Sequence, residues 1–251
     1  MFIRGGLIYM IITMNVNGFC GLCNNCKPNC KNNQCFQART NNMNRIKDLL
    51  NIQLAEDVAI LQEVPYASNE NIMYKEFEKI FSEYTIVQPL HLQRYAKQCT
   101  IAIFTKNSNW KSSNVSKLCY NLEANGSHRF GNKFIELQHN NLELLGVHMP
   151  YDQKAWKNLI SSSNRFSIIV GDFNAHENEH RHEKKSSNLP FLREHNFIDA
   201  VPSNAVTYYP TETTLDHFFF QKNKISESNI TISIFPSGLS DHATILVELR
   251  Q

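Results

Sequence analysis

Short apolar stretches that end on polar side chains are the feature that most restricts how this chain can fold. The segment "SIIVGDFN", residues 167–174, passes from apolar, β-branched residues into Gly171, Asp172 and Asn174. Side chains two residues apart on an extended chain share a face, so Asp172 and Asn174 can point into one cleft. A Gly-Asp pair after a strand is by itself typical of an ordinary turn. The pattern gains weight because it recurs along the chain.

Five other apolar runs carry polar residues at one end. The residues concerned are Asn15 and Asn17 after "IITM", Glu63 after "VAILQ", His148 after "LELLGV", Asp216 before "HFFF", and Asp241 and His242 before "ATILV". Each has a simpler explanation as a turn or an exposed loop residue. Because ligands bind at strand ends in α/β sheets, the set as a whole predicts one polar site.

Length and composition favour a single globular domain. The chain has 251 residues, of which 42% are hydrophobic and 11% aromatic, so it can bury a sizeable core. We find no repeat and no linker, and we expect one domain over residues 1–251 with a Cys-rich insertion at about 18–38. No apolar run approaches the roughly 20 residues of a membrane span. The first residues read as a strand and not as a signal peptide, and Met10 is an alternative start to Met1.

Hydrophobic periodicity predicts an α/β protein with many strands and few helices. We expect helices at 41–54, 69–84, 152–163 and 188–196, and strands at 7–16, 57–63, 99–106, 132–140, 141–150, 166–172, 215–221, 229–236 and 242–250. The apolar faces of the first two helices would include Leu54 and Ile72. The last strands follow one another without helices, so the sheets must be mixed or partly antiparallel.

Taken in order, "TMNVNG", "ILQE", "GVHMP", "IIVGDFN", "TLDHFFF" and "GLSDHATI" resemble the motifs of the endonuclease/exonuclease/phosphatase superfamily. That family includes deoxyribonuclease I, exonuclease III, the apurinic endonucleases, sphingomyelinases and inositol phosphatases. The resemblance extends from about residue 10 to the C-terminus. It implies a four-layer sandwich, in which two mixed β-sheets pack face to face with helices on the outside.

Phosphodiester hydrolysis needs charge neutralisation, an activated water and help for the leaving oxygen. Oxygen ligands suit Mg²⁺ or Mn²⁺, so Glu63 is the first candidate metal ligand, with Asn15 beside it. The resemblance implies that Asp241 contributes as well. Asp172 is the candidate to orient or deprotonate water, and Asn174 would donate a hydrogen bond to a phosphoryl oxygen.

Two histidines complete the predicted catalytic set. His242 would bind the phosphate or transfer a proton, and Asp216 would orient it and favour its cationic form. His148 would act as a general acid or an electrophile toward the leaving oxygen. His217 follows Asp216 on the same strand and therefore faces the other side, so we expect its replacement to be nearly silent. Asn17 departs from the acidic residue often found there in the family. One fewer carboxylate would weaken a second metal site, so we do not assume two metals and leave their number open.

The insertion contains "CGLCNNCKPNC", with Cys20, Cys23, Cys26 and Cys30 at the spacing C-x₂-C-x₂-C-x₃-C. This spacing favours a Zn²⁺ or iron–sulfur site, with free thiols and disulfides as the alternatives. A reducing compartment, and hence the cytoplasm, is the corresponding expectation. The later run "HENEHRHEKK" reads better as a solvated loop than as a metal site.

We therefore expect a metal-dependent nuclease that acts on DNA, without a membrane span and as a monomer. A phosphatase or lipid phosphodiesterase on the same fold is the alternative. A non-catalytic nucleic-acid-binding protein is disfavoured because the acidic and histidine set is complete. The net charge of +2 is compatible with a phosphate-bearing partner without requiring one.

Overall fold

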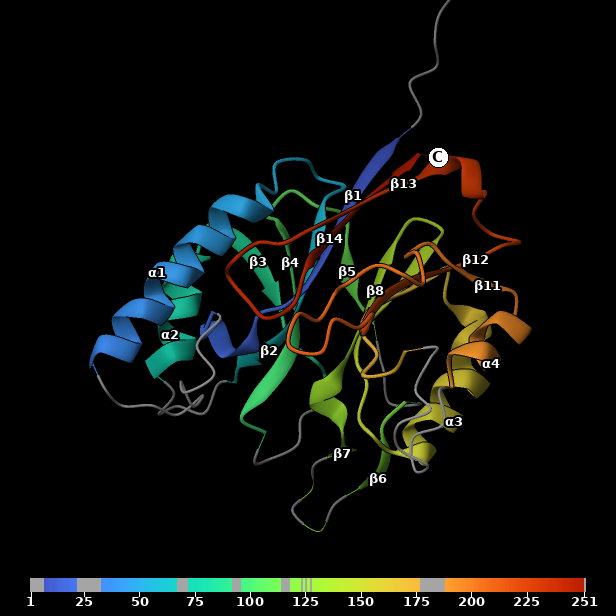
Figure 1. The fold of residues 1–251 in the computed structure, drawn as a ribbon, viewed down its shortest axis with the longest axis horizontal. Helices are drawn as coiled ribbons and strands as arrows, with labels where there is room; N and C mark the ends of the chain where they lie inside the picture. The colour runs from blue at the N-terminus through green and yellow to red at the C-terminus, as the bar shows by residue number, and fades with distance from the viewer. Residues whose placement is uncertain are drawn as a thin grey trace, which may run out of the picture.

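The computed structural model describes residues 7–21, 33–66, 72–91, 96–113, 118–122, 124, 126, 128–176 and 188–250. Within these residues, two six-stranded mixed sheets form the centre of the molecule (Figure 1). The predicted α/β sandwich with two mixed sheets is confirmed. The described part of the chain contains no helix that is both long and apolar enough to cross a membrane.

The first sheet has the order β13-β14-β1-β2-β4-β3. Its strands are β1 (Ile8–Asn15), β2 (Val58–Pro65), β3 (Tyr84–Val87), β4 (Gln98–Thr105), β13 (Ile230–Phe235) and β14 (Thr244–Arg250). Strands β1 and β2 are parallel, whereas β14 runs antiparallel to β1. The end of β1, the end of β2 and the start of β14 therefore lie at the same edge.

The second sheet has the order β11-β12-β10-β9-β8-β5. Its strands are β5 (Lys111–Ser112), β8 (Phe134–His139), β9 (Leu142–His148), β10 (Ile168–Asp172), β11 (Phe197–Asp199) and β12 (Asp216–Gln221). Here β9 and β10 are parallel and β12 is antiparallel to β10. The two sheets thus repeat one arrangement, with polar residues where the central parallel strands end. A separate hairpin joins β6 (Tyr120–Leu122) to β7 (His128–Arg129).

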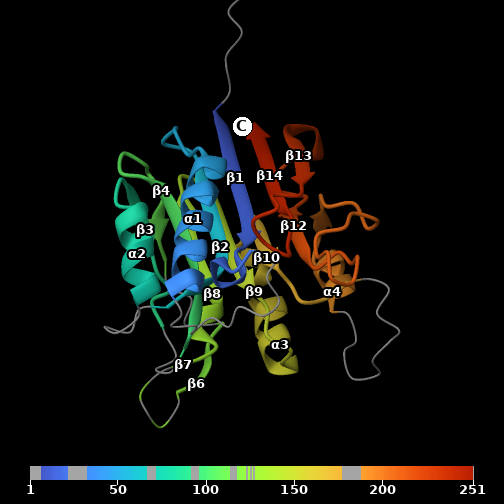
Figure 2. The same ribbon diagram turned by 60° about the vertical axis from the view of Figure 1, so that its left-hand side comes forward.

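Helices cover the outer face of each sheet, as Figure 2 shows. They are α1 (Asn33–Leu50) and α2 (Ile72–Ile80) on the first sheet, and α3 (Gln153–Ser162) and α4 (Leu189–Glu194) on the second. Alternate residues of β1 separate the layers: Ile11 packs between the sheets, whereas Ile12 packs toward α1 and α2. This alternation is the physical basis of the four layers, because each strand buries both of its faces.

Three details differ from the sequence-based expectation. Helix α1 begins at Asn33, inside the residues assigned to the insertion, and ends at Leu50, so Leu54 lies beyond it and is exposed. Ile72 begins α2 but is 67% exposed. Strands β3, β5, β6, β7 and β11 were not predicted, since each is only two to four residues long.

Candidate active site

A pocket of about 170 Å³ opens at the edge where the polar strand ends of both sheets meet. Its lining consists of Asn15, Asn17, Glu63, Tyr151, Asp172, Asn174, Tyr208, Leu215, Asp241 and His242. Six of the eight predicted catalytic and metal residues are among them. The other two, His148 and Asp216, lie directly behind the pocket in contact with lining residues.

The two sheets are joined at the pocket by Asn15 and Asp172. Asn15 ends β1 and donates from Nδ2 to Oδ2 of Asp172, which ends β10, at 3.0 Å. The backbone N–H of Asn174 donates to the other carboxylate oxygen at 2.8 Å. Burial raises the pKa of Asp172, and the nearby charge of Asp216 raises it further, while His242 and these hydrogen bonds oppose the rise. A carboxylate with a raised pKa is suited to accept a proton near neutral pH.

Gly171 lies inside strand β10, within the strand expected at 166–172. Its φ of 136° lies in a region open to glycine, and a Cβ there would lie 2.1 Å from the carbonyl oxygen of Val147. The glycine therefore permits close pairing of β10 with β9 directly before Asp172.

Glu63 reaches the pocket because β2 is irregular at that point. The pairing of β2 with β4 shifts between Leu61 and Val64, and Glu63 has a left-handed φ of 57°. Its Oε2 accepts a hydrogen bond from Nε2 of Gln98 at 3.1 Å. A strained backbone conformation at a carboxylate in a pocket is typical of functional sites.

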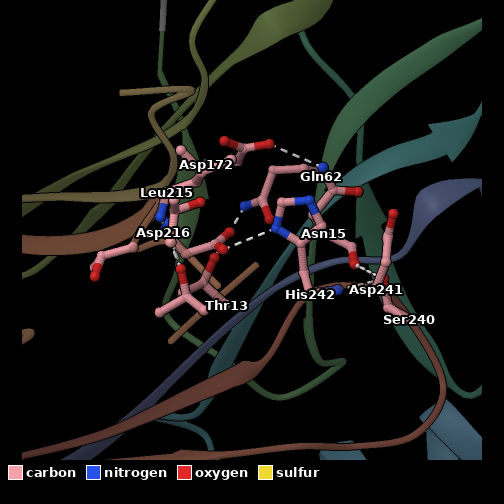
Figure 3. Close-up of polar contacts among 12 residues, drawn as sticks. Thr13, Asn15, Gln62, Asp172, Leu215, Asp216, Ser240, Asp241 and His242 are labelled. Atoms are coloured by element: carbon pink, nitrogen blue, oxygen red, sulfur yellow. Dashed lines mark hydrogen bonds and ion pairs between the residues drawn. The ribbon is translucent and has the colours of Figure 1, made fainter. Parts of the chain in front are cut away.

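His242 and Asp216 form a buried pair, and Figure 3 shows them pointing toward each other beside Asp172 and Asn15. Nδ1 of His242 lies 2.8 Å from Oδ2 of Asp216. Burial lowers the pKa of His242, but the charge and hydrogen bond of Asp216 and the charges of Asp172 and Asp241 outweigh it and raise the pKa to about 10. The imidazole is therefore cationic at neutral pH and able to face a phosphate.

His148 has a different environment. Its Nδ1 lies 2.8 Å from Nζ of Lys133, and its Nε2 is 3.5 Å from Oε1 of Glu63 and 3.7 Å from Oδ2 of Asp172. Burial, followed by the charges of Lys133 and His242, holds the pKa of His148 well below its usual value. A neutral ring can donate a hydrogen bond but has no surplus proton to release. The neutral state of the ring therefore favours the predicted role of electrophile over that of general acid.

The donor set fits a hard divalent cation. Carboxylates of Glu63 and Asp241 and the amide oxygen of Asn15 line the same pocket, and oxygen ligands are those that Mg²⁺ and Mn²⁺ prefer. Asp172, Asp216 and His242 also bring three ligand atoms within 4.8 Å of one another. That second group is the poorer choice, because Nδ1 of His242 is engaged with Asp216 and a cationic imidazole cannot bind a metal.

Sequence reasoning missed two residues of this region. The phenol of Tyr151 donates to Oδ1 of Asn174 at 2.8 Å, and Lys133 contacts His148. No sequence pattern marks either residue, because the place of each in the site depends on contacts between separate strands and loops. Tyr208 lies in "TYYP", a stretch with the composition of a stacking loop, and its ring packs 4.8 Å from that of His242.

Two predicted features fall wholly or partly outside the described residues. Cys20 is buried after β1, but Cys23, Cys26 and Cys30 lie outside, so the cysteine site stays a prediction. The same holds for residues 177–185 of the histidine-rich run.

Comparison with known proteins identifies one matching family model and several solved structures of similar fold. A family model described as endonuclease-reverse transcriptase matches residues 135–246. The endonuclease domain of TRAS1, a telomere-specific non-LTR retrotransposon, aligns with 97% of this chain and 99% of its own at 14% identity and a TM-score of 0.59. An AP endonuclease from Archaeoglobus fulgidus aligns with 95% of this chain and 98% of its own at 14% identity and a TM-score of 0.60.

A third solved structure, the 3′ phosphatase NExo from Neisseria bound to a product DNA hairpin, covers 97% of this chain and 100% of its own. Its sequence identity is 13% and its TM-score 0.61. No curated protein matches the chain. At these identities the solved structures establish the fold, whereas the reaction has to be argued from the site.

Proposed function

We propose that this chain, a member of the endonuclease/exonuclease/phosphatase superfamily, is a divalent-metal-dependent phosphodiesterase that cleaves DNA as an endonuclease. The observation that carries the proposal is the convergence of Asn15, Glu63, Asp172, Asp241 and His242 in one pocket. These residues come from opposite ends of the chain and from both sheets. The combination of carboxylates, an amide and a cationic imidazole matches what phosphodiester hydrolysis requires.

Each side chain has a distinct task in the proposed reaction. Asp172, held by Asn15 and by the N–H of Asn174, orients water and accepts its proton. His242, kept cationic by Asp216, donates a hydrogen bond to a phosphoryl oxygen and stabilises its charge. His148 donates from Nε2 toward the leaving oxygen. The side-chain amide of Asn174 already donates to the carbonyl of Met149, and its second N–H remains for the phosphate.

The cation would be held by Glu63, Asn15 and Asp241. When bound, it supplies positive charge that offsets the negative charge of the phosphoryl group.

Aromatic side chains at the pocket support a nucleic-acid substrate. Tyr151 is 65% exposed beside the pocket, and Tyr208 lines it on the side of His242. Exposed aromatic rings next to a phosphate site are suited to stacking on nucleobases. The similar solved structures are an endonuclease domain, an AP endonuclease and a phosphatase bound to a DNA hairpin, and these agree with DNA as the substrate.

The direct test is incubation of the purified protein with plasmid, single-stranded DNA, RNA, a 3′-phosphorylated duplex and small phosphoesters, each with Mg²⁺ and with EDTA. We expect nicking of the plasmid with Mg²⁺ and none with EDTA. Release of phosphate from the monoesters alone would favour the phosphatase alternative. Binding of DNA without any hydrolysis would reject the enzyme assignment.

A substitution of Glu63 tests the metal ligand separately. Glu63→Gln removes the charge and keeps the shape, so we expect loss of nearly all hydrolysis and weaker Mg²⁺ binding by calorimetry, with unchanged thermal unfolding. The matched control is Glu227→Gln, on an exposed turn before β13 and at the end of the first sheet opposite the pocket, which should behave as wild type. Full activity of Glu63→Gln at low Mg²⁺ would exclude the role.

A further inference from the structure

Lys133 is a nearly buried cation whose side chain ends on His148. Nζ of Lys133 lies 2.8 Å from Nδ1 of the imidazole. The ammonium form of lysine has three donors and no acceptor, so in this contact Nδ1 of His148 is the acceptor. A neutral histidine that accepts at Nδ1 carries its proton on Nε2. The contact therefore selects one of the two neutral tautomers.

The selected tautomer directs an N–H toward the pocket. Nε2 of His148 faces Oε1 of Glu63 and Oδ2 of Asp172, at 3.5 and 3.7 Å. With the opposite tautomer, an unprotonated Nε2 would face these two carboxylates and repel them. The ring would then also present a lone pair where the proposed reaction needs a donor.

The position of Lys133 is set by the register of β8 with β9 and by the short turn in which it lies. Phe134 pairs with Val147 across β8 and β9, so the next position along this register places Lys133 opposite His148. Lys133 is the last residue of a 3₁₀ turn (η2, Gly131–Lys133), and each residue of this turn is held by a contact with a neighbouring segment. A Cβ at Gly131 would lie 1.6 Å from the carbonyl oxygen of His91, so only glycine fits there.

The next two residues of the turn are hydrogen-bonded to β4. Asn132 donates from its side chain to the carbonyl of Gln98 at 2.8 Å, and Thr100 donates to the carbonyl of Lys133 at 3.1 Å. Gln98 also donates to Glu63 from its side chain. The turn that positions Lys133 is thus tied to the strand that positions the candidate metal ligand.

Lys133 lies among ionisable groups of the candidate site and contacts the ring that it would orient. Burial lowers its pKa, and the charges of Glu63 and Asp172 oppose that effect. The described surroundings contain no carboxylate hydrogen-bonded to Nδ1 of His148, the position where an acidic partner would favour the cationic ring instead. The surroundings of His148 therefore favour a neutral ring that donates from Nε2.

We infer that Lys133 is a positioning residue that fixes His148 as the Nε2–H tautomer and aims that N–H at the reacting phosphate. Its part in hydrolysis rests on the proposed phosphodiesterase function, whereas its effect on the ring does not. Lys133 itself is not among the residues that line the pocket.

Nitrogen-15 NMR of histidine-labelled protein tests the tautomer without any substrate. The signals of His148 are assigned by their loss in His148→Gln. In wild type we expect a protonated Nε2 and a hydrogen-bonded, unprotonated Nδ1. Lys133→Met should shift the ring toward a mixture of tautomers, Lys133→Arg should retain the wild-type pattern, and Lys111→Met, an exposed lysine on β5, should change nothing.

Single-turnover hydrolysis adds the second readout. Lys133→Met should lower the rate of the chemical step by about tenfold or more with little change in KM, on the scale of one misplaced hydrogen-bond donor, and Lys133→Arg should restore it. A wild-type ring protonated at Nδ1, or at both nitrogens, would overturn the inference even if Lys133→Met does not fold. An unchanged tautomer and rate in a folded Lys133→Met would overturn it as well.

The two hypotheses fail in different ways. The expected tautomers without hydrolysis of any phosphoester would reject the nuclease and leave Lys133 as the residue that orients His148. Normal hydrolysis in a folded Lys133→Met would leave the nuclease intact and reject the positioning role.

Discussion

At the scale of single residues, His242 and Asp216 are best understood as one unit. Asp216 orients the imidazole through Nδ1 and contributes the charge that keeps it cationic. In the proposed reaction, either side chain alone would therefore be ineffective. The carboxylate without the ring contacts no phosphate, and the ring without the carboxylate loses both its orientation and much of its positive charge.

A double-mutant cycle measures this dependence. His242→Ala and Asp216→Ala should each lower kcat by about 100-fold or more, and the double variant should cost much less than the product of the two. Single-turnover rates for the three variants give the coupling. Effects that multiply strictly would show that the two residues act independently.

His217 follows Asp216 along β12 but has a structural role. Its Nδ1 lies 2.6 Å from Oδ2 of Asp199, and its Nε2 lies 3.0 Å from the carbonyl oxygen of Ala175. The ring is 2% exposed. The sequence correctly placed it on the face opposite Asp216, and a substitution that is nearly silent in hydrolysis stays a prediction. We expect a loss of stability, because removing a buried ring with two hydrogen-bonded nitrogens leaves both partners unsatisfied.

The stability contributed by His217 should depend on pH. Burial lowers its pKa, but the hydrogen bond and charge of Asp199 and the carbonyl of Ala175 raise it above 6.5 overall. A raised folded-state pKa gives stability that is complete below the unfolded value and is lost as pH rises through the folded value. The difference in unfolding free energy between wild type and His217→Gln, measured by urea titration, should therefore shrink as the pH rises above the unfolded value of about 6.5. A difference independent of pH would mean that the pKa of the ring is the same in the folded and unfolded protein.

At the scale of elements, the pairing of β9 with β10 sets the position of Asp172 through Gly171. A side chain at Gly171 would combine an unfavourable φ with a contact to the carbonyl of Val147. Gly171→Ala should therefore lower the unfolding free energy by more than about 3 kcal/mol and abolish hydrolysis.

Gly238→Ala is the matched control. Gly238 also has a positive φ, 64°, but no atom lies within 4 Å of the Cβ that alanine would add. Backbone strain alone should cost about 1 kcal/mol there. Equal costs at the two positions, measured by denaturant unfolding, would mean that the close approach of β9 and β10 contributes nothing.

At the scale of the whole molecule, the site exists because two sheets pack against each other. Ile60 of β2 is fully buried between them, and a Cβ on Gly146 of β9 would lie 2.6 Å from its Cγ2. This close packing places the polar ends of β1 and β2 against those of β9 and β10. The pocket therefore depends on the sheet interface as well as on its own residues.

Ile60→Ala should lower the unfolding free energy by about 2–5 kcal/mol, the cost of a cavity in a packed core. Ile72→Ala, at an exposed position of the same residue type, should change it by less than about 0.5 kcal/mol. Urea unfolding of both variants provides the comparison. A small effect of Ile60→Ala would contradict tight packing between the sheets.

The apolar runs and the polar residues at their ends were enough to predict much of the fold and the chemical character of the site. Apolar runs such as "IIVG" and "HFFF" can satisfy their burial only as central strands, and Glu63, Asp172 and His242 at their ends predict a common edge. Short strands such as β5 and β11 escaped prediction because a run of two or three residues has no measurable periodicity.

What only the tertiary structure decided is the pairing of partners across the chain. Lys133 and His148 become neighbours through the register of β8 and β9, and Asn15 reaches Asp172 only because the two sheets face each other. His217 bonds to Asp199 rather than facing solvent for the same reason. Sequence fixes the face on which a side chain lies, since that follows from local geometry, but the partner on that face depends on register and sheet packing, which are set by the whole core.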